Sequence, residues 1–269
     1  MVAQNTLDQI KALTVNEKVH PNDQMFGDGM NPLKMKHYLS TGRSALLVID
    51  GVLTARAGYP DGQAAIASVL DFGCGFGRVA RYLRGGFPDA EIFGTDLISG
   101  AAAFCRDEFG YNMLPEGLLP TGKFDLIWAG SVFTHFPDSM ARKILLDLIG
   151  ALSSNGVLVM TTQGRNAYLM VAEGLQKESP RPFELYNLER RHALHVTSSY
   201  ATTGYGFVNY KNHEVGVCIA RPEWYSNIAL ADPNTVQIAM IEKGWDNHQD
   251  VLAFMRAPVL NPKKGAMYF

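Results

Sequence analysis

The sequence predicts an open α/β fold built on a mainly parallel sheet. Residues 69–72 form a mostly apolar run that leads into alternating glycines and then into an amphipathic helical pattern. This succession indicates a buried strand, a tight turn and the start of a helix. Two further apolar runs, residues 90–97 and 124–129, follow at separations that leave room for crossover helices. Strands that alternate with helices in this way assemble into a parallel sheet.

The glycine turn distinguishes between two classes of nucleotide-like ligand. A dinucleotide fingerprint reads G-x-G-x-x-G, whereas here the third glycine, Gly77, comes one position early and Arg78 holds the expected place. Asp71 stands at the end of the strand, where its carboxylate would repel a pyrophosphate and attract a cation. The turn therefore favours a cationic ligand without phosphate, and the alternative is a glycine-rich turn that binds nothing.

The pattern D-x-G-x-G-x-G of residues 71–77 resembles the first motif of class I S-adenosylmethionine (SAM)-dependent methyltransferases. The resemblance implies a Rossmann-like, seven-stranded sheet of the class I methyltransferase type. It also implies a glycine loop along the methionine part of SAM and an acid, here Asp71, that helps to position the SAM amino group, commonly through water. The cofactor-binding residues implied in this motif are Asp71, Gly73, Cys74, Gly75, Phe76 and Arg78.

The second predicted strand ends in another acid. Asp96 lies 19 residues beyond Gly77, and a carboxylate at this place can accept hydrogen bonds from both hydroxyls of a ribose. In the methyltransferase family this position binds the SAM ribose, and Leu97 and Ile98 are assigned to the same site. The alternative is that Asp96 is the N-cap of the following helix, although Ser99 is a better placed cap.

The third element, F-D-L-I-x-x-x-x-V-x-x-H at residues 124–135, is similar to the fourth-strand motif of the same family. In that family the end of this strand lies beside the transferable methyl group, which assigns Gly130 and Ser131 to the cofactor site. Residues 155–162 match the fifth strand, so the resemblance covers residues 65–165 closely.

The remaining elements follow from periodicity and from glycine or proline breaks. Residues 1–62 are expected to form an N-terminal segment and helical cap, of which residues 1–30 are either partly disordered or closed over a ligand. The methyltransferase domain then spans residues 63–269. Helices are expected over residues 33–57, 77–84, 99–109, 139–152 and 166–175, and a poorly marked third strand over residues 111–114.

Residues 176–220 are expected to be an insertion between strands five and six that builds the pocket for the methyl acceptor. Two strand-like runs, residues 197–210 and 214–220, predict a hairpin. Residues 236–241 and 251–255 predict the antiparallel strands that close the sheet. Aromatic side chains of the insertion can stack on an acceptor, or alternatively pack the hairpin onto the core. They are Tyr200, Tyr205, Phe207 and Tyr210.

Two histidines are candidates for the catalytic general base that an alcohol acceptor needs. His135 follows the fourth strand at the methyl-facing edge, and His213 lies in the insertion. A packing or loop-ordering role is the alternative for His135, while His248, beside Trp245, is expected to be structural. No spacing typical of a metal site occurs, so no metal is expected.

Composition limits the partners and the compartment. The 269 residues carry a net charge of −2 without a Lys/Arg cluster, which disfavours a nucleic-acid partner. The three cysteines lack C-x-x-C spacing, which favours a reducing compartment. No apolar run approaches the length of about 18 residues that a transmembrane helix needs, and residues 1–18 do not resemble a signal peptide. We therefore expect a cytoplasmic protein with no membrane partner.

Together these observations predict an enzyme that transfers a methyl group from SAM to an oxygen or nitrogen of a small molecule or sugar, leaving S-adenosylhomocysteine. The motifs also resemble bacterial methyltransferases of glycan and natural-product pathways. Two alternatives remain. One is a non-catalytic SAM-binding scaffold or partner subunit, and the other is a nicotinamide-dependent oxidoreductase, against which Arg78 argues.

Overall fold

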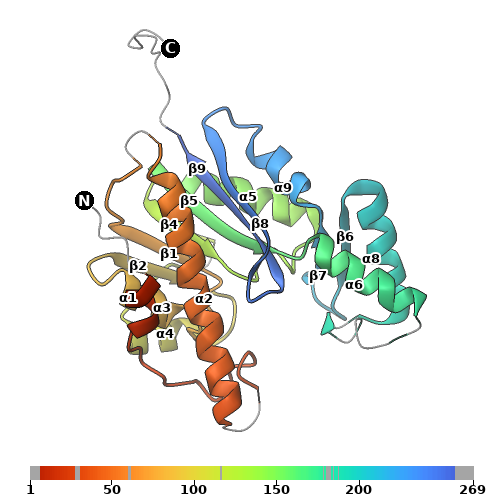
Figure 1. Cartoon of the computed structure of the whole chain (residues 1–269), viewed down its shortest axis with the longest axis horizontal. Coiled ribbons are helices and arrows are strands. Elements are labelled where there is room, and N and C mark those ends of the chain that lie inside the picture. The colour runs from red at the N-terminus through yellow and green to blue at the C-terminus, as the bar shows by residue number, and fades with distance from the viewer. Residues whose placement is uncertain are drawn as a thin grey trace.

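The computed structural model describes residues 7–27, 31–59, 62–115, 117–177, 179, 183, 185–186 and 188–257. Within them a seven-stranded sheet with the order β3-β2-β1-β4-β5-β9-β8 forms the centre (Figure 1). The first five strands in this order are parallel, and β9 runs antiparallel to both β5 and β8. The strands are β1 Ser68–Phe72, β2 Glu91–Thr95, β3 Asn112–Met113, β4 Phe124–Ala129, β5 Leu152–Thr162, β8 Thr235–Trp245 and β9 Gln249–Arg256. The predicted Rossmann-like sheet is confirmed.

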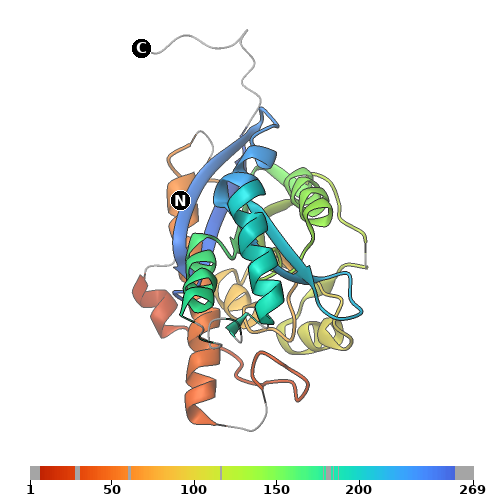
Figure 2. The ribbon, with the colours of Figure 1, turned by 90° about the vertical axis from the view of Figure 1, so that its right-hand side faces the viewer.

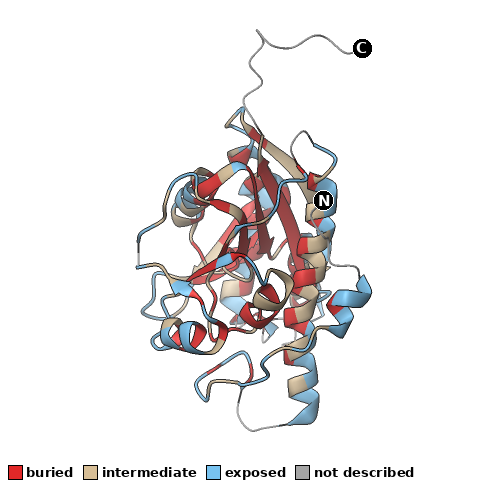
Figure 3. Ribbon diagram, turned by 90° about the vertical axis from the view of Figure 1, so that its left-hand side faces the viewer, coloured by how far each residue is buried: buried red, intermediate tan, exposed pale blue. Residues whose placement is uncertain are grey.

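Helices cover both faces of the main sheet (Figure 1, Figure 2), because its central strands are apolar on both sides. Alternate residues of a strand face opposite layers. Val69 and Leu126 pack with α2, α3 and α4, whereas Leu70 and Ile127 pack with α5 and α9. Figure 3 shows the buried strands between these layers. Among the described residues, no helix combines the length and apolar character that crossing a bilayer requires. The helices are α1 Leu7–Ala12, α2 Pro32–Arg56, α3 Ala80–Gly86, α4 Ala101–Phe109, α5 Asp138–Ala151 and α9 Pro222–Ala229.

A smaller unit, made of the described residues between 165 and 220, lies to one side of the main sheet, and we name it the side module (Figure 1). It contains α6 Arg165–Gln176, α8 Arg190–Thr203 and an antiparallel hairpin of β6 Tyr205–Asn209 and β7 Gly216–Ala220. The side module has its own core, in which Val171, Val196 and Ile219 pack together. It therefore presents a second packed body beside the carboxyl edge of β5.

The first strand predicted for the hairpin is too long. Residues 197–203 are the last turns of α8, in which Ala193, Val196 and Tyr200 share one buried face. The Thr197 hydroxyl donates to the carbonyl of Ala193 at 2.7 Å, a bond that accommodates this β-branched residue inside a helix. The threonines and serines that indicated a strand are thus overruled by helical packing, while the hairpin itself is confirmed.

Two further expectations concern the β8–β9 connection and the N-terminal segment. The connection predicted over residues 244–250 is shorter, because β8 continues to Trp245 and β9 begins at Gln249. Asp246 adopts a φ of 52° in the remaining turn, a conformation that short polar side chains tolerate. Residues 1–6 and 28–30 of the predicted N-terminal segment lie outside the described residues.

At the amino edge of the sheet, Asp125 links the beginnings of two strands to β4. Its Oδ2 accepts hydrogen bonds from the backbone N–H groups of Ala67 (2.9 Å) and Ser68 (3.1 Å), where β1 begins. Its Oδ1 accepts from the Ser153 hydroxyl at 2.6 Å, at the start of β5. Both carboxylate oxygens are therefore occupied by bonds within the protein.

We expect Asp125→Asn to lower the free energy of unfolding by about 1–2 kcal/mol, because a neutral amide replaces charge-assisted hydrogen bonds that are roughly twice as strong. Urea unfolding at pH 7 measures the difference. An unchanged unfolding midpoint would show that these bonds contribute nothing to the sheet's stability.

Candidate active site

The turn that follows β1 is built from three glycines with positive φ angles. Gly73, Gly75 and Gly77 have φ values of 79°, 51° and 82°, a region that non-glycine residues rarely adopt. A Cβ atom at Gly73 would lie 2.4 Å from Val132, and one at Gly77 would lie 2.1 Å from Phe109. A Cβ at Gly75 would meet nothing within 4 Å. The outer glycines are required for packing, while the middle one faces open space.

Asp96 connects this turn to the end of β2. Its Oδ2 accepts from the Gly75 backbone N–H at 2.7 Å, and its Oδ1 accepts from the Ile98 N–H at 2.8 Å. The helix-capping alternative is wrong, because α4 has Gly100 at its N-cap and no side-chain cap. A carboxylate offers about four lone pairs, so Asp96 can still accept two more hydrogen bonds.

An exposed apolar pair stands beside Asp96. Leu97 is 75% exposed and Ile98 is 52% exposed, at the carboxyl edge of the sheet. Large apolar side chains left open next to a polar anchor suit a flat apolar group of a ligand. The sequence-predicted residues Asp96, Leu97 and Ile98 are thus brought to one place with Gly75.

Asp71, by contrast, lies beneath the turn. It is 1% exposed and accepts a hydrogen bond from the Tyr111 hydroxyl at 3.2 Å. Burial raises the pKa of Asp71 to about 7, the nearby charge of Asp96 adds to the rise, and the Tyr111 bond opposes it. Cys74 and Phe76 are also buried, so these motif residues support the turn from the core side.

The described part of the N-terminal segment passes over the glycine turn. The His20 ring stacks on Phe76 with 4.2 Å between ring centroids and 7° between planes, and its edge meets Phe104. Asp23 accepts a hydrogen bond from the Tyr38 hydroxyl of α2 at 2.6 Å. Residues 13–27, which we name the strap, therefore cover the turn on the side of α2 and α4.

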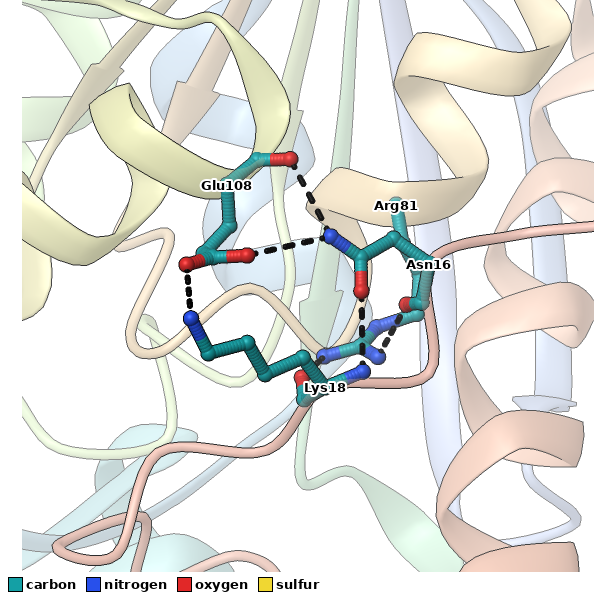
Figure 4. Close-up of polar contacts among 4 residues, drawn as sticks. All are labelled: Asn16, Lys18, Arg81 and Glu108. Atoms are coloured by element: carbon teal, nitrogen blue, oxygen red, sulfur yellow. Dashed lines mark hydrogen bonds and ion pairs between the residues drawn. The ribbon is translucent and has the colours of Figure 1, made fainter.

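Arg81 fastens the strap to the turn (Figure 4). Its guanidinium donates to the carbonyls of Asn16 (2.6 Å) and Lys18 (3.1 Å) and to the carbonyl of Gly77 (2.9 Å). Lys18 also forms an ion pair with Glu108 of α4. Sequence reasoning missed Arg81, because nothing in the pattern of α3 shows that this arginine is buried against carbonyl groups far away in the chain.

Arg78 lies between α2 and the β8–β9 hairpin. Its guanidinium stands over the Trp245 ring, 5.3 Å from the centroid. Burial lowers the pKa of Arg78, while Tyr38, Asp23 and Asp246 raise it. This arginine is charged and only partly accessible, so it provides a positive group near the strap.

A closed ring of hydrogen bonds holds the loop after β4. Ser131 has a φ of 62°, which is costly for a residue with a side chain. Its N–H donates to Thr161 Oγ1 at 2.7 Å, Thr161 donates to Gln249 Oε1 at 2.5 Å, and Gln249 Nε2 donates to Ser131 Oγ at 2.9 Å. Gly130 beside it packs on Trp128. Thr161 and Gln249 were not predicted, and their only signal is polarity within otherwise apolar strands.

The next part of the same loop contacts the hairpin of the side module. His135 Nδ1 lies 2.8 Å from the Gly216 carbonyl and 3.2 Å from the Tyr210 hydroxyl. A carbonyl only accepts hydrogen bonds, so Nδ1 carries a proton, and in the neutral ring the lone pair is then on Nε2. The Gly216 N–H also donates to the His135 carbonyl at 2.8 Å, which locks the loop to β7.

His213 occupies the exposed tip of that hairpin. Its backbone N–H donates to the Tyr210 carbonyl at 3.0 Å, and within the described residues its ring makes no hydrogen bond or ring contact. Tyr205 is buried and donates to the Phe136 carbonyl at 2.9 Å, which is a packing role.

In the described ranges no three His, Cys, Asp or Glu side chains gather as metal ligands. His248 stacks on Tyr186, and burial lowers its pKa.

A sequence model of the methyltransferase domain matches residues 42–199, which is more than half of the chain. The chain belongs to this methyltransferase-domain family. Family membership and the seven-stranded sheet confirm the predicted class I methyltransferase fold, with SAM as the cofactor. The narrower likeness to enzymes of glycan and natural-product pathways stays a prediction.

The individual relatives have low sequence identity to this chain. Malonyl-[acyl-carrier protein] O-methyltransferase of Acetivibrio thermocellus is 29% identical over 106 residues, 37% of each chain. Chloroplastic tocopherol O-methyltransferase of Arabidopsis thaliana is 25% identical over 193 residues, 68% of this chain and 53% of that protein. The matches thus span between about a third and about half the length of these relatives.

A solved structure shows the same fold. Magnesium protoporphyrin IX methyltransferase from Synechocystis PCC 6803, with bound S-adenosylhomocysteine, has a TM-score of 0.52 at 15% identity. The likeness covers 87% of this chain and 92% of that one. At this identity the comparison supports the architecture and leaves the acceptor to other arguments.

The raised pKa of Asp71 predicts a pH-dependent effect of Asp71→Asn. Its folded pKa is about 7 against an ordinary value of 3.8, so between these values the folded chain holds a proton that the unfolded chain has released. The contribution of Asp71 to the free energy of unfolding therefore falls as the pH rises through this window, and the variant lacks this contribution.

We expect the two proteins to differ least at pH 4, with the variant gaining steadily on the wild type up to about pH 7. Urea midpoints measured from pH 4 to pH 8 check this. A difference that stays constant with pH would contradict the raised pKa of Asp71.

Proposed function

We propose that this protein transfers a methyl group from SAM to an oxygen or nitrogen of a small molecule. The observation that carries the proposal is the open space at Gly75, next to the anchored carboxylate of Asp96 and the exposed side chains of Leu97 and Ile98. That combination offers a bare backbone surface, a hydroxyl acceptor and an apolar platform at one sheet edge. The names of two relatives describe O-methyltransferases, which supports oxygen as the methylated atom.

The residues present fit a nucleoside with a cationic amino acid attached. Asp96 has lone pairs left for two ribose hydroxyls. The exposed side chains of Leu97 and Ile98 can pack against an adenine ring. Gly75 allows close approach of the methionine part, and Asp71 lies buried beneath the turn. When bound, SAM supplies an electrophilic methyl group on a positively charged sulfur.

His135 is the residue of this chain best placed to take a proton from a hydroxyl acceptor. The Gly216 carbonyl holds a proton on Nδ1, so in the neutral ring Nε2 is the nitrogen that can accept a proton. The Tyr210 hydroxyl contacts the same nitrogen, so the hairpin of the side module orients the ring. His213 lies at the tip of that hairpin and is the second candidate, although its ring is exposed.

The two alternative functions, an oxidoreductase and a non-catalytic scaffold, are less consistent with the chemistry of the site. Arg78, at the place of the third glycine of a dinucleotide fingerprint, stacks on Trp245 and does not offer the bare backbone that a pyrophosphate needs. A non-catalytic SAM-binding scaffold would need no base with a fixed tautomer beside the β4 loop. The His135 contacts are compatible with a base and with a loop-ordering role, and the variant below distinguishes them.

Cofactor binding is tested by calorimetry with SAM, S-adenosylhomocysteine and NAD. We expect micromolar-range dissociation constants for the first two and no binding of NAD. Asp96→Ala should weaken SAM binding by about 1.5–3 kcal/mol, because two ribose hydroxyls lose their acceptor. Binding of NAD alone would refute the proposed function, and unchanged SAM affinity in the variant would remove Asp96 from the site.

The base is tested with His135→Asn, whose side-chain amide can still donate to the Gly216 carbonyl. Methyl transfer from labelled SAM into a small-metabolite extract should fall about 10²–10⁴-fold, the range for loss of a general base. SAM affinity and melting temperature should stay close to those of the wild type. His213→Ala tests the second candidate in the same assay, and normal turnover in the His135 variant would show that His135 only orders the loop.

A further inference from the structure

The ring of hydrogen bonds around Ser131 leaves one hydroxyl proton without an acceptor. The Ser131 N–H donates to Thr161 Oγ1, the Thr161 hydroxyl donates to Gln249 Oε1, and Gln249 Nε2 donates to Ser131 Oγ. The Ser131 hydroxyl therefore accepts within the ring and does not donate there. In the part of the chain that the structure describes, no hydrogen bond uses its proton.

The direction of the ring follows from the buried hydroxyl of Thr161, a residue that is 0% exposed. If the Gln249 amide were turned round, its nitrogen would face Thr161. The Thr161 hydroxyl would then accept two hydrogen bonds, and its own proton would lose its acceptor inside the protein. Buried donors are nearly always paired, so the satisfied orientation of the amide is the one that leaves the Ser131 proton free.

Ser131 is the accessible member of the ring. Thr161 and Gln249 are 0% and 7% exposed, whereas Ser131 is partly exposed. The next residue in the chain, Val132, lies against the glycine turn, because a Cβ atom at Gly73 would be 2.4 Å from its side chain. The free hydroxyl is thus one residue away from a direct contact with the turn that the proposed function assigns to the cofactor.

The same loop carries the proposed base. The Thr134 hydroxyl donates to the Ser131 carbonyl at 2.9 Å, which folds the loop back on itself. Phe133 and Thr134 are buried, while Ser131 and His135 are both partly exposed. One free donor and one possible proton acceptor therefore reach the surface from five consecutive residues.

Ser131 keeps its position at a conformational cost. Its φ of 62° is unusual for serine, and most of the other described non-glycine residues with positive φ are Asn or Asp, which tolerate this conformation. Such strain persists where the surrounding bonds enforce it, and it occurs frequently at functional sites. The ring fixes the Ser131 hydroxyl in one place and leaves its proton available.

We propose that the Ser131 hydroxyl donates a hydrogen bond to the acceptor atom and thereby selects oxygen over nitrogen and carbon. This inference rests on the proposed function and names the atom that is methylated at that site. A hydroxyl or carboxylate oxygen has a lone pair left when another forms the bond to the methyl carbon, so it can accept the Ser131 proton.

A nitrogen acceptor has only the lone pair that attacks the methyl group. An amine N–H could be donated to the second lone pair of Ser131 Oγ, but the serine proton would then stay without an acceptor, which is unfavourable. A carbon acceptor offers no lone pair to this proton either. The free donor therefore matches oxygen best.

The atoms and protons of the transfer balance in this arrangement. As the bond between oxygen and the methyl carbon forms, the bond between that carbon and sulfur breaks, and its electron pair stays on sulfur in S-adenosylhomocysteine. The proton of a hydroxyl acceptor passes to His135 Nε2, whereas a carboxylate has no proton to lose. Ser131 keeps its own proton throughout, so its role is to contact and orient the acceptor oxygen.

The methylated atom is identified with SAM that carries carbon-13 in its methyl group. The full chain is incubated with this SAM and a small-metabolite extract, and the products are analysed by NMR. The chemical shift of the transferred methyl group distinguishes attachment to oxygen, nitrogen and carbon. We expect the label on oxygen. Alkaline treatment then separates methyl esters, which hydrolyse, from methyl ethers, which do not.

Two variants, Ser131→Ala and Ser131→Gly, remove the hydroxyl but differ in stability. Glycine relieves the positive φ and alanine does not, so the alanine variant should melt at the lower temperature. Transfer to oxygen should nevertheless fall roughly tenfold in both, because both lose the same hydrogen bond. The share of label on nitrogen should rise in both, and the affinity for S-adenosylhomocysteine should stay unchanged.

Asn155→Gly is the matched control for the change to glycine. Asn155 has a φ of 63° near the start of β5, at the amino edge of the sheet. This substitution relieves the same kind of conformation far along the strand from Ser131, so transfer to oxygen should equal that of the wild type.

Several results would overturn the role of Ser131. They are label on nitrogen or carbon in the wild type, normal transfer to oxygen in both Ser131 variants, or a loss of transfer that follows melting temperature. A tenfold weaker affinity for S-adenosylhomocysteine in both variants would also overturn it, because the hydroxyl would then bind the cofactor. The absence of any labelled product, or no binding of S-adenosylhomocysteine to the wild type, would instead refute the proposed function.

Discussion

The carboxyl edge of this protein depends on how closely the glycine turn after β1 approaches its neighbours. Gly73 lies against Val132 of the β4 loop, and Gly77 lies against Phe109 of α4. A side chain at either position would push the turn away from the sheet. Because the turn lies close to its neighbours, the Gly75 N–H can donate a hydrogen bond to Asp96 at the end of β2. The relative positions of β1, β2 and β4 at this edge therefore follow from two close contacts that only glycine permits.

Two carboxyl groups next to this turn differ in how deeply they are buried. Asp71 lies under the turn, where burial raises its pKa, and Asp96 lies beside it, where two backbone N–H groups bind its oxygens. Because their environments differ, Asp71 and Asp96 can serve different functions. Asp71 packs beneath the turn and accepts a hydrogen bond from the Tyr111 hydroxyl, while Asp96 has lone pairs left beside the turn.

Much of the sheet and of the cofactor edge could be predicted from the sequence. Asp96 and Ser131 could be placed at the carboxyl edge because the ends of parallel strands meet there. Their roles in binding SAM stay predictions. The final turns of α8 were mistaken for a strand, since Thr197 and its neighbours favour strands locally and only packing against Val171 and Ile219 reveals the helix. The roles of the histidines as bases stay predictions.

The sequence by itself determined the order of strands and helices, the glycine turn and the acids at the strand ends, because these depend on short-range periodicity and backbone conformation. Only the tertiary structure decided which distant groups meet. Arg81 reaches the carbonyls of the strap, and Gln249 closes the ring around Ser131. Such contacts join residues far apart in the chain, and their burial and pairing are set by the packing of whole layers, which no local pattern records.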